Sequence, residues 1–558
     1  MAKRTRTLKR TRTLTTTLTT AAAIGLVGVL TSQAQAQSGG GQGAEIALLK
    51  QQLRLMEQKL DKLEKQTAAN TTAAAKATAK VEKVEAKTNK TDTKLANLGD
   101  ANAAYPVKGP VAPFGAVVTM PNNRPTICTA DGQNCVSITS RVHWDVGGYD
   151  YHPNSSATNP QKLDDGENLR RARIGLIGKF FGDWNYALIY DFGGSSDGFG
   201  GTASIGAAPP AGGTAVGFLP GGAVSGIENA YLSYTGFHPF DGKLAIEAGV
   251  MDLDYTLDEA TSSNNIVFME RASSGLIAQN IAAGDFRSAI GARWYTDRLW
   301  AGAYATGPAA GAIHSASSLN PNGTTEQTGA IARVAGQVVS GNDYSIHLGG
   351  EAEWLIRAPH DEITGAQTLT LSDRPELRLD PTTLISTGAL AGVSGAQVYS
   401  GEAAATYGSL WVQGEYFWYN VDRNNNPIPL TSVKFDGGYA QASYVLTGER
   451  HKYVAESASY GGIVPANPFS PAGGGWGAWE IAGRVSTMNL NDQLATANGV
   501  AGGRQTIYTA ALNWYINGNV RFMFDYLHGT VAKQISATNT GDAGSRFDAF
   551  AMRTQVAF

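Results

Sequence analysis

The sequence contains no apolar run long enough to form a transmembrane helix. Its longest run, Ala21 to Leu30, has about ten residues, whereas a spanning helix needs about 20. Charged residues make up only 16% of the chain, with 44 Lys and Arg against 47 Asp and Glu. Because there is no basic excess, we expect no nucleic-acid partner. Only two of the 558 residues are cysteine, which excludes a fold held together by many disulfides.

Features that would indicate an enzyme are also scarce. We find no pair of histidines at metal-ligand spacing and no glycine-rich loop of the kind that cradles phosphate. His143 and His347 stand alone, and we interpret them as wall residues rather than catalysts. We therefore expect no enzymatic activity, no cofactor and no metal.

The first 36 residues have the layout of a secretory signal peptide. A basic, Thr-rich start is followed by the short apolar run and then by Ala34-Gln35-Ala36, a small-residue cleavage site. A short buried helix is the alternative interpretation. Removal of residues 1–36 would take away six basic residues, which leaves 38 Lys and Arg against 47 Asp and Glu, a net charge of −9.

The two cysteines lie close together in a Pro/Gly-rich linker that we place at residues 105–135. Cys128 and Cys135 flank a segment with the turn pair Asp131-Gly132. In an exported protein this spacing predicts a small hairpin closed by a disulfide. Zinc binding is disfavoured because no second pair of ligands lies nearby.

Residues 37–104 are predicted to form a coiled-coil stalk. A heptad register that starts at Ile46 places mostly apolar or small residues at positions a and d as far as Leu98, and neither Pro nor Gly interrupts it before Gly99. Such a sustained repeat indicates association between helices, whereas a lone amphipathic helix packed on a domain is the alternative. The residues at positions a and d do not decide whether two or three helices associate.

Residues 136–558 repeat one unit of about ten alternating residues followed by turn signals. Sixteen segments fit this description: 137–151, 168–181, 184–193, 226–236, 243–251, 287–295, 299–306, 328–339, 344–357, 397–407, 410–422, 437–446, 478–487, 505–516, 520–530 and 546–558. Short and long connections alternate, as in a transmembrane β-barrel. Residues 447–477 break this rule, so they contain either an inserted turn or a further hairpin that raises the count to eighteen.

The last predicted strand shows the alternation clearly. Phe550, Met552 and Val556 share one face, and Arg553 and Gln555 share the other. A barrel in lipid turns its apolar face outward and its charged face toward a wet lumen. We therefore predict an all-β transmembrane barrel of about 16 antiparallel strands in the outer membrane of a bacterium, preceded by the helical coiled coil in the periplasm.

The same parity assigns basic residues to the lumen, where arginine and lysine favour anions. They are Arg141, Arg171, Arg173, Lys179, Lys243, Arg287, Arg293, Arg484, Arg521 and Arg553. The alternative role for many of them is in salt bridges that stiffen the wall, because the same face carries acidic residues such as Asp145 and Asp525. The loop 252–286 contains an apolar segment, Ile266 to Met269, and we expect this loop to fold inward and narrow the barrel.

Several stretches resemble the phosphate-selective porins of the O and P type. They include NLRRARIGLIGKFFGDWNYALIYDF at 168–192, TSSNNIVFMERA in the loop 252–286 and LNWYINGNVRFMFDYLH at 512–528. The resemblance implies a trimer of sixteen-stranded barrels that pass phosphate or other anions along a ladder of arginines. Arg170, Arg171 and Arg173 match the strand motif of the family, and Arg271 lies in the loop motif.

Charge departs from the family pattern. Residues 139–558 carry 25 Lys and Arg against 38 Asp and Glu, a net of −13, and only six of the basic residues are lysines. The leading hypothesis is a porin for passive diffusion of small anions such as phosphate, embedded in outer-membrane lipid as a homotrimer. The alternatives are a weakly selective solute or cation porin, and a barrel that anchors a structural tether to the cell wall, with peptidoglycan as the partner.

Overall fold

The computed structural model describes residues 115–154, 162–193, 226–283, 286–309, 324–325, 327–358, 360–361, 367–424 and 430–558, together with residues 54, 57, 58 and 61. The chain divides into two compact units, Met1–Ala103 and Ala104–Phe558. In the first unit the four described residues are helical and exposed. The predicted signal peptide and the rest of the predicted stalk lie outside the described residues, as does the linker before residue 115.

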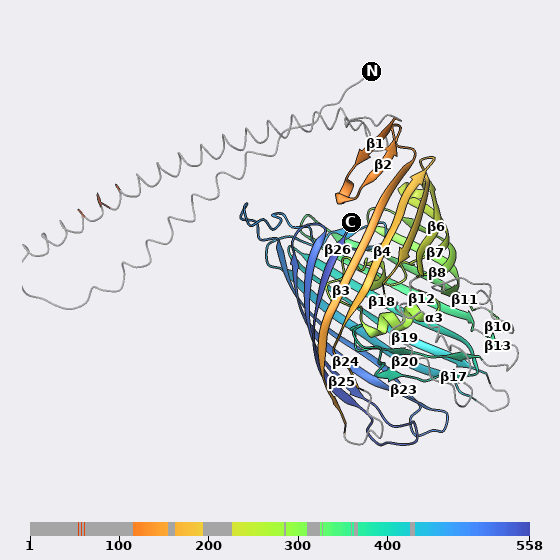
Figure 1. Cartoon of the computed structure of the whole chain (residues 1–558). Helices are drawn as coiled ribbons and strands as arrows, with labels where there is room; N and C mark the ends of the chain where they lie inside the picture. The colour runs from red at the N-terminus through yellow and green to blue at the C-terminus, as the bar shows by residue number, and fades with distance from the viewer. Residues whose placement is uncertain are drawn as a thin grey trace, which may run out of the picture. The chain divides into compact units, whose positions relative to one another are not determined.

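Sixteen strands of the second unit form a closed antiparallel barrel (Figure 1). In chain order they are β3 (Cys135–Pro153), β4 (Gly166–Phe180), β5 (Trp184–Asp191), β6 (Gly226–Phe237), β7 (Lys243–Met251), β8 (Arg287–Tyr295), β9 (Leu299–Ala309), β11 (Thr328–Ser340), β12 (Tyr344–Arg357), β18 (Val393–Tyr407), β19 (Leu410–Arg423), β20 (Val433–Val445), β23 (Ala478–Asp492), β24 (Val500–Tyr515), β25 (Val520–Ala532) and β26 (Ser545–Ala557). The barrel closes where β26 pairs with β3, from Ala557 opposite Arg141 to Ser545 opposite Pro153.

The predicted sixteen-stranded barrel is therefore confirmed, and most strand boundaries agree to within a few residues. The main difference is length, because β18 begins at Val393, β23 runs to Asp492 and β24 begins at Val500. These extensions contain glycine and polar residues that break the alternation of apolar residues, yet their backbones continue the ladder. Among the described residues, no helix has both the length and the apolar character needed to cross a membrane.

Side-chain alternation separates an apolar outer face from a polar inner face. On β26, Phe550 is 58% exposed and Val556 40% exposed, whereas Arg553 between them is fully buried. The same contrast recurs on β19, where Trp418 is exposed and its neighbours Phe417 and Tyr419 are buried. A strand presents successive side chains to opposite faces, so the sequence pattern translates directly into an apolar outside.

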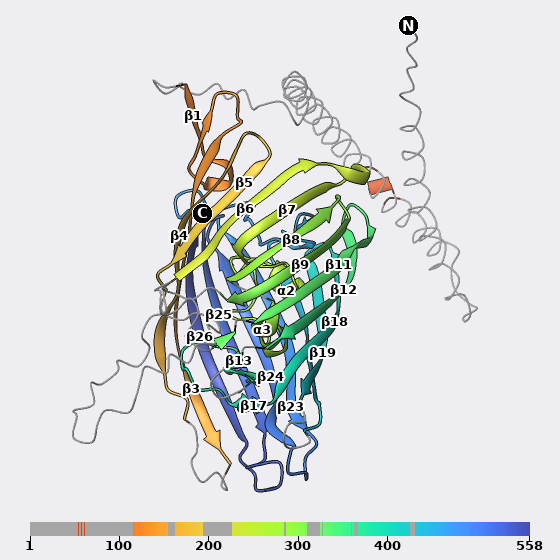
Figure 2. The same ribbon diagram turned by 90° about the vertical axis from the view of Figure 1, so that its right-hand side faces the viewer.

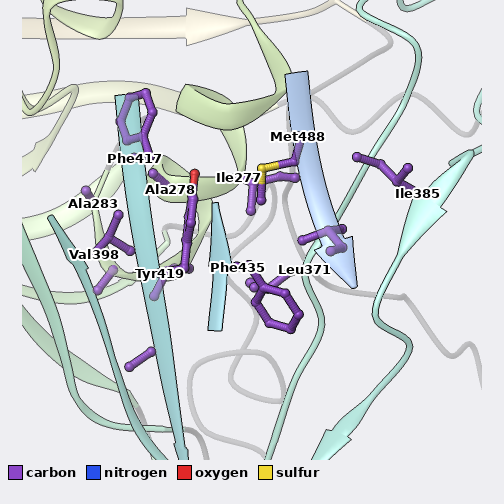
Figure 3. Close-up of a cluster of buried hydrophobic side chains, with 14 of the residues drawn as sticks. Ile277, Ala278, Ala283, Leu371, Ile385, Val398, Phe417, Tyr419, Phe435 and Met488 are labelled. Atoms are coloured by element: carbon purple, nitrogen blue, oxygen red, sulfur yellow. The ribbon is translucent and has the colours of Figure 1, made fainter. Parts of the chain in front are cut away.

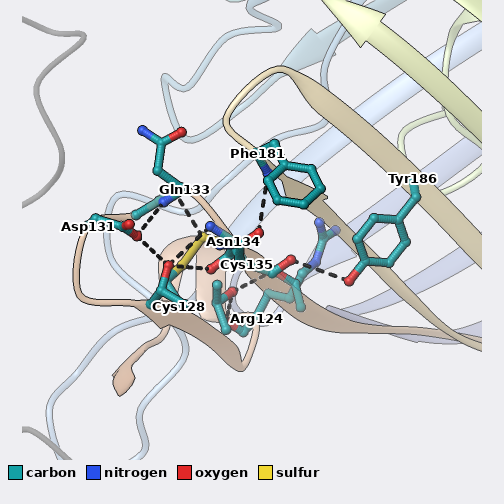
Figure 4. Close-up of a disulfide and its surroundings, with 12 residues drawn as sticks. Arg124, Cys128, Asp131, Gln133, Asn134, Cys135, Phe181 and Tyr186 are labelled. Atoms are coloured by element: carbon teal, nitrogen blue, oxygen red, sulfur yellow. Dashed lines mark hydrogen bonds between the residues drawn. A yellow bond between two sulfur atoms is a disulfide. The ribbon is translucent and has the colours of Figure 1, made fainter. Parts of the chain in front are cut away.

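A small hairpin extends the sheet at the start of β3. β1 (Ala116–Thr119) pairs with β2 (Thr126–Thr129), the 3-10 turn η1 (Pro121–Asn123) joins them, and β2 pairs with the first residues of β3. Cys128 and Cys135 are opposite each other and joined by a disulfide (Figure 4). The carboxylate of Asp131 accepts hydrogen bonds from the Thr129 hydroxyl and a backbone N–H, and these bonds lower its pKa.

The connections at one end of the barrel are short, with one exception. They are 181–183, 238–242 with the turn η2 (Pro239–Asp241), 296–298, 341–343, 408–409 and 516–519. The exception is 446–477, which contains a separate two-stranded sheet of β21 (Tyr453–Val454) and β22 (Ser459–Tyr460). Because β20 pairs directly with β23, this segment is a long inserted turn, and the eighteen-stranded alternative is wrong.

The long connections at the other end carry the remaining short elements. Those in the described residues are α2 (Leu257–Ala260), α3 (Ser273–Ala282), β10 (Thr324–Thr325), β13 (His360–Asp361), β14 (Thr368–Leu369), β15 (Ser372–Asp373), β16 (Ile385–Ser386) and β17 (Leu390–Ala391). The strands among them pair as β10 with β13, β14 with β17 and β15 with β16.

Two of these connections pack against the inner wall of the barrel. Ile277 of α3 and Leu371 of the connection 358–392 belong to one buried apolar cluster with Phe417, Phe435 and Met488 of the wall strands (Figure 3). α3 also lies within the outline of the barrel in both views (Figure 2). The apolar core of the protein therefore lies inside the barrel. Packing in this core fixes the two connections that narrow the barrel.

Candidate permeation site

The loop 252–286, between β7 and β8, is bonded to the inner wall on the far side of the barrel. The backbone N–H of Leu257 donates to Glu415 of β19 at 2.7 Å, and that of Met269 donates to Asp525 of β25 at 2.8 Å. The apolar segment Ile266 to Met269 is 6% exposed or less throughout. The predicted inward fold of this loop is confirmed, and burial of the apolar segment is its physical reason.

Three arginines surround Glu270, the residue that follows this apolar segment. Arg170 binds its carboxylate through two bonds of 2.8 and 3.0 Å. Arg553 donates a bond of 2.7 Å to it, and a guanidinium nitrogen of Arg171 lies 3.9 Å away. All four side chains are 4% exposed or less. Positive charge from two wall strands thus meets the inner loop at this carboxylate.

A β-bulge explains how two consecutive arginines reach the same site. The pairing of β3 with β4 shifts register between His143, opposite Arg171, and Trp144, opposite Leu169, so Arg170 has no cross-strand partner there. Strict alternation would send Arg170 and Arg171 to opposite faces, whereas an extra residue in one strand lets both turn inward. The two side chains are 2% and 1% exposed.

Arg484 and Arg521 hold the backbone of the same loop. Arg484 donates to the carbonyl of Glu270 at 2.8 Å and to the carboxylate of Glu376 at 2.6 Å. Arg521 donates to the carbonyl of Ile266 at 2.8 Å. The Arg484 guanidinium also lies 4.6 Å from the ring centre of Phe268. These arginines fix the position of the loop through its main chain.

Three further predicted residues form ion pairs or local bonds. Arg173 pairs with Asp191 at 2.8 Å and with Glu228, and Arg293 pairs with Asp254 at 2.8 Å. Arg287 donates to two backbone carbonyls, those of residues 283 and 307. Arg173 thus forms salt bridges between wall strands, whereas Arg293 joins the wall to the inner loop and also pairs with Glu247 of β7 at 3.4 Å.

Arg271 is placed inside the loop rather than on the wall. Its guanidinium donates to the carbonyls of Asp258, Glu259 and Thr261, and it pairs with the Glu259 carboxylate at 3.2 Å. It is 6% exposed. Arg271 thus ties two parts of the loop together.

Arg141, Lys179 and Lys243 lie apart from the cluster around Glu270. Arg141 donates to the hydroxyls of Ser262 and Ser263 in the inner loop. Lys179 is opposite Cys135, at the far end of β4, about 30 Å along the strand from Arg170 at 3.3 Å per residue. Lys243 is the exposed first residue of β7.

A second inward segment, 446–477, is anchored by a residue that the sequence analysis omitted. Arg333 of β11 pairs with Glu402 at 3.0 Å and donates to the carbonyls of Ser457 and Ala458 at 2.9 Å each. The alternation on β11 could have identified Arg333, because it shares the buried face with Ile331 and Ala335. No local pattern marks Glu376 or Arg378, two of the four buried charged residues in the described part of the connection 358–392.

Glu402 also belongs to a group of three buried carboxylates. Oxygen atoms of Glu351, Glu402 and Glu415 lie within 4.8 Å of one another, a spacing that could hold a cation. His347 lies 2.7 Å from Oε1 of Glu402, and Arg333 donates to the same oxygen at 3.0 Å. Acidic side chains thus gather on this part of the inner wall.

The closed barrel, its apolar outside, and its inner loops bonded to a charged wall define a porin. The sequence profile of the family described as "Phosphate-selective porin O and P" matches residues 136–558. The chain therefore belongs to the phosphate-selective porin O and P family, and it is an outer-membrane porin, which indicates a channel rather than an enzyme.

Individual relatives are more distant. Porin O of Pseudomonas aeruginosa is 24% identical over 459 residues, which span 77% of this chain and 90% of that protein. An uncharacterized protein of Caulobacter vibrioides is 31% identical over 181 residues, 32% of this chain and 33% of that protein. Among solved structures, in-vitro folded OmpT of Vibrio cholerae covers 76% of this chain and 98% of its own, with 10% identity and a TM-score of 0.42.

Proposed function

We propose that the protein is a porin through which small anions, phosphate included, diffuse passively across the outer membrane. The observation that carries the proposal is the convergence of arginines on the inner loop, where Arg484 and Arg521 bind its backbone carbonyls in addition to the three arginines at Glu270. Guanidinium groups bind phosphate and carboxylate oxygens through a planar fork of donors. The family description supports the same class of solute, because it names phosphate.

The path that we propose for the anions passes between the wall strands and the loop 252–286. The basic residues proposed to line or hold this path are Arg141, Arg170, Arg171, Arg173, Lys179, Lys243, Arg271, Arg287, Arg293, Arg484, Arg521 and Arg553. The residues that bind the backbone of the loop set the width of this path. The residues that retain excess positive charge attract the anions. In a confined interior of low dielectric constant such charges act more strongly than in bulk water.

A weakly selective or cation-preferring porin is the second candidate. It is favoured by the net charge of −13 in residues 139–558 and by the pairing of Arg173 and Arg293 with carboxylates. The clustered carboxyl groups of Glu351, Glu402 and Glu415 are inner-wall groups that could coordinate a cation. The sign of the selectivity therefore separates the two candidates.

We further propose that the mature protein is a homotrimer with residues 37–104 as a coiled coil in the periplasm. The heptad register supports association between chains, and a helical stalk could also reach peptidoglycan. Residues 1–36 are proposed as the signal peptide that directs export.

Solute flux into liposomes tests the proposed function. Purified protein in liposomes should admit phosphate and chloride faster than potassium or Tris, measured by swelling in isotonic salts that share one counter-ion. Faster entry of cations would favour the second candidate. If the barrel is folded and neither anions nor cations enter the liposomes, both candidate functions are contradicted and a structural tether is favoured.

A further inference from the structure

Glu270 occupies the position that a free oxyanion would take between the guanidinium groups. Arg170 and Arg553 reach it from β4 and β26, two strands on either side of β3. The bond from Arg170 is bidentate, with one nitrogen on each carboxylate oxygen. This is the geometry by which arginine binds carboxylate and phosphate ligands.

Several charged side chains of the wall meet at Glu270. Arg170, Arg171 and Arg553 contribute three positive charges, whereas Glu270 and Asp145 contribute two negative ones, and Asp145 is itself bound by Arg553. Loss of the Glu270 carboxylate would remove the bidentate acceptor of Arg170 and one acceptor of Arg553. All these side chains are almost fully buried, so an uncompensated charge there is costly.

We propose that Arg170, Arg171 and Arg553 form an oxyanion-binding site whose resident ligand is the tethered carboxylate of Glu270. Glu270 fixes the loop 252–286 to the wall and at the same time neutralises a site that a small oxyanion, carboxylate or phosphate, would otherwise occupy. The effect of this neutralisation on permeation rests on the proposed function, whereas the binding itself does not.

A tethered ligand competes at a high effective concentration. A group on a short linker acts as if present at millimolar concentration or above, so free anions displace it poorly. The wild-type protein should therefore bind no oxyanion at this site at moderate concentration. A variant that lacks the carboxylate should bind one, because its arginines are already in place.

Glu270→Ala tests the binding directly. Its unfolding temperature, measured by the heat-dependent electrophoretic mobility of the barrel, should be lower than that of the wild type in chloride. Acetate or phosphate at equal ionic strength should raise it by about 2–4 °C at hundredfold excess over the dissociation constant. An unfolding temperature that is the same in all three salts would overturn the proposal.

Glu259→Ala is the matched control. Glu259 lies in the same loop and is also buried, but its partner Arg271 already donates to three backbone carbonyls. This variant should lose stability without recovery in acetate or phosphate. If the unfolding temperature of Glu259→Ala recovered as much as that of Glu270→Ala, the effect would be a general effect of the salts, and the proposed site would be overturned.

Glu270→Gln keeps the shape of the side chain and gives a second measurement, which also serves if Glu270→Ala does not fold. The same salt-dependent rise in unfolding temperature is expected, with a smaller amplitude. In a planar bilayer under a KCl gradient, its reversal potential should shift toward anion selectivity relative to the wild type, whichever sign the wild type has. An unchanged reversal potential would overturn the role of Glu270 in permeation, and a cation-selective wild type would contradict only the proposed function.

Discussion

Arg553 of β26 and Asp145 of β3 are directly opposite each other across the seam that closes the barrel. The guanidinium binds both carboxylate oxygens, at 2.6 and 2.7 Å, and both side chains are 1% exposed or less. The same guanidinium reaches Glu270 of the inner loop. One side chain thus links the seam of the barrel to the inner loop.

Replacement of Arg553 by alanine should destabilise the barrel strongly. The change leaves two buried carboxylates without this partner, which costs about 3–5 kcal/mol when one member of a buried ion pair is removed. Thermal or urea unfolding of the refolded protein in detergent measures the loss. Arg546→Ala, at an exposed position of the same strand, is the control and should change stability by less than about 0.5 kcal/mol. Equal losses in both variants would contradict the assignment.

Arginine in place of Phe550 tests which face of β26 meets lipid. Phe550 is 58% exposed near the middle of the strand, and a charge on the lipid face costs about 2–4 kcal/mol at the midplane of the bilayer. Folding titrations into lipid vesicles measure this loss. Val556→Arg, near the end of the strand, should cost only about 0–1 kcal/mol. A smaller loss at Phe550 than at Val556 would contradict the orientation.

Loss of the Arg333 side chain should release the segment 446–477 from the wall. Arg333 donates to the carbonyls of Ser457 and Ala458, so Arg333→Ala removes both contacts as well as the pair with Glu402. We expect faster proteolysis within 446–477 and a larger single-channel conductance. Arg298→Ala removes bonds from an exposed arginine to Gln337 and Val338 and should change neither. Unchanged proteolysis in Arg333→Ala would show that the segment is held by other contacts.

The disulfide should stabilise the small hairpin without affecting permeation. A loop of seven residues predicts about 2–3 kcal/mol from the entropy of the unfolded chain. In the double variant Cys128→Ser and Cys135→Ser, hydrogen exchange should accelerate in β1 and β2 but not in β23 or β24. Slower or absent conduction in this variant would contradict the expectation that the hairpin does not affect permeation.

The sequence predicted the barrel well because each strand carries its own signal. The alternation on 546–558 already separates Phe550 and Val556 from Arg553, and the structure places the first two outside and the third inside. The alternation depends on chain geometry alone, so it needs no knowledge of partners. The extra length of β18 and β24 was missed because glycine and polar residues there carry no such signal.

The candidate site was predicted only in part, because its geometry depends on contacts between distant residues. The partner of Arg170 is Glu270, 100 residues further along the chain, and the partner of Arg553 is Asp145, 408 residues away. The bulge that turns Arg170 inward has no recognised sequence signal either. Alternation could identify charged residues of the inner face, but it could not show that many of them bind one another.

The reversal potential of the wild-type channel tests the central claim most directly. Single channels of the purified protein in a planar bilayer are recorded under a KCl gradient, with phosphate then added to one side. An anion-selective potential, with chloride current reduced by phosphate, is the predicted result. A cation-selective potential that phosphate leaves unchanged would contradict the account and would make the interior carboxylates the groups that decide selectivity.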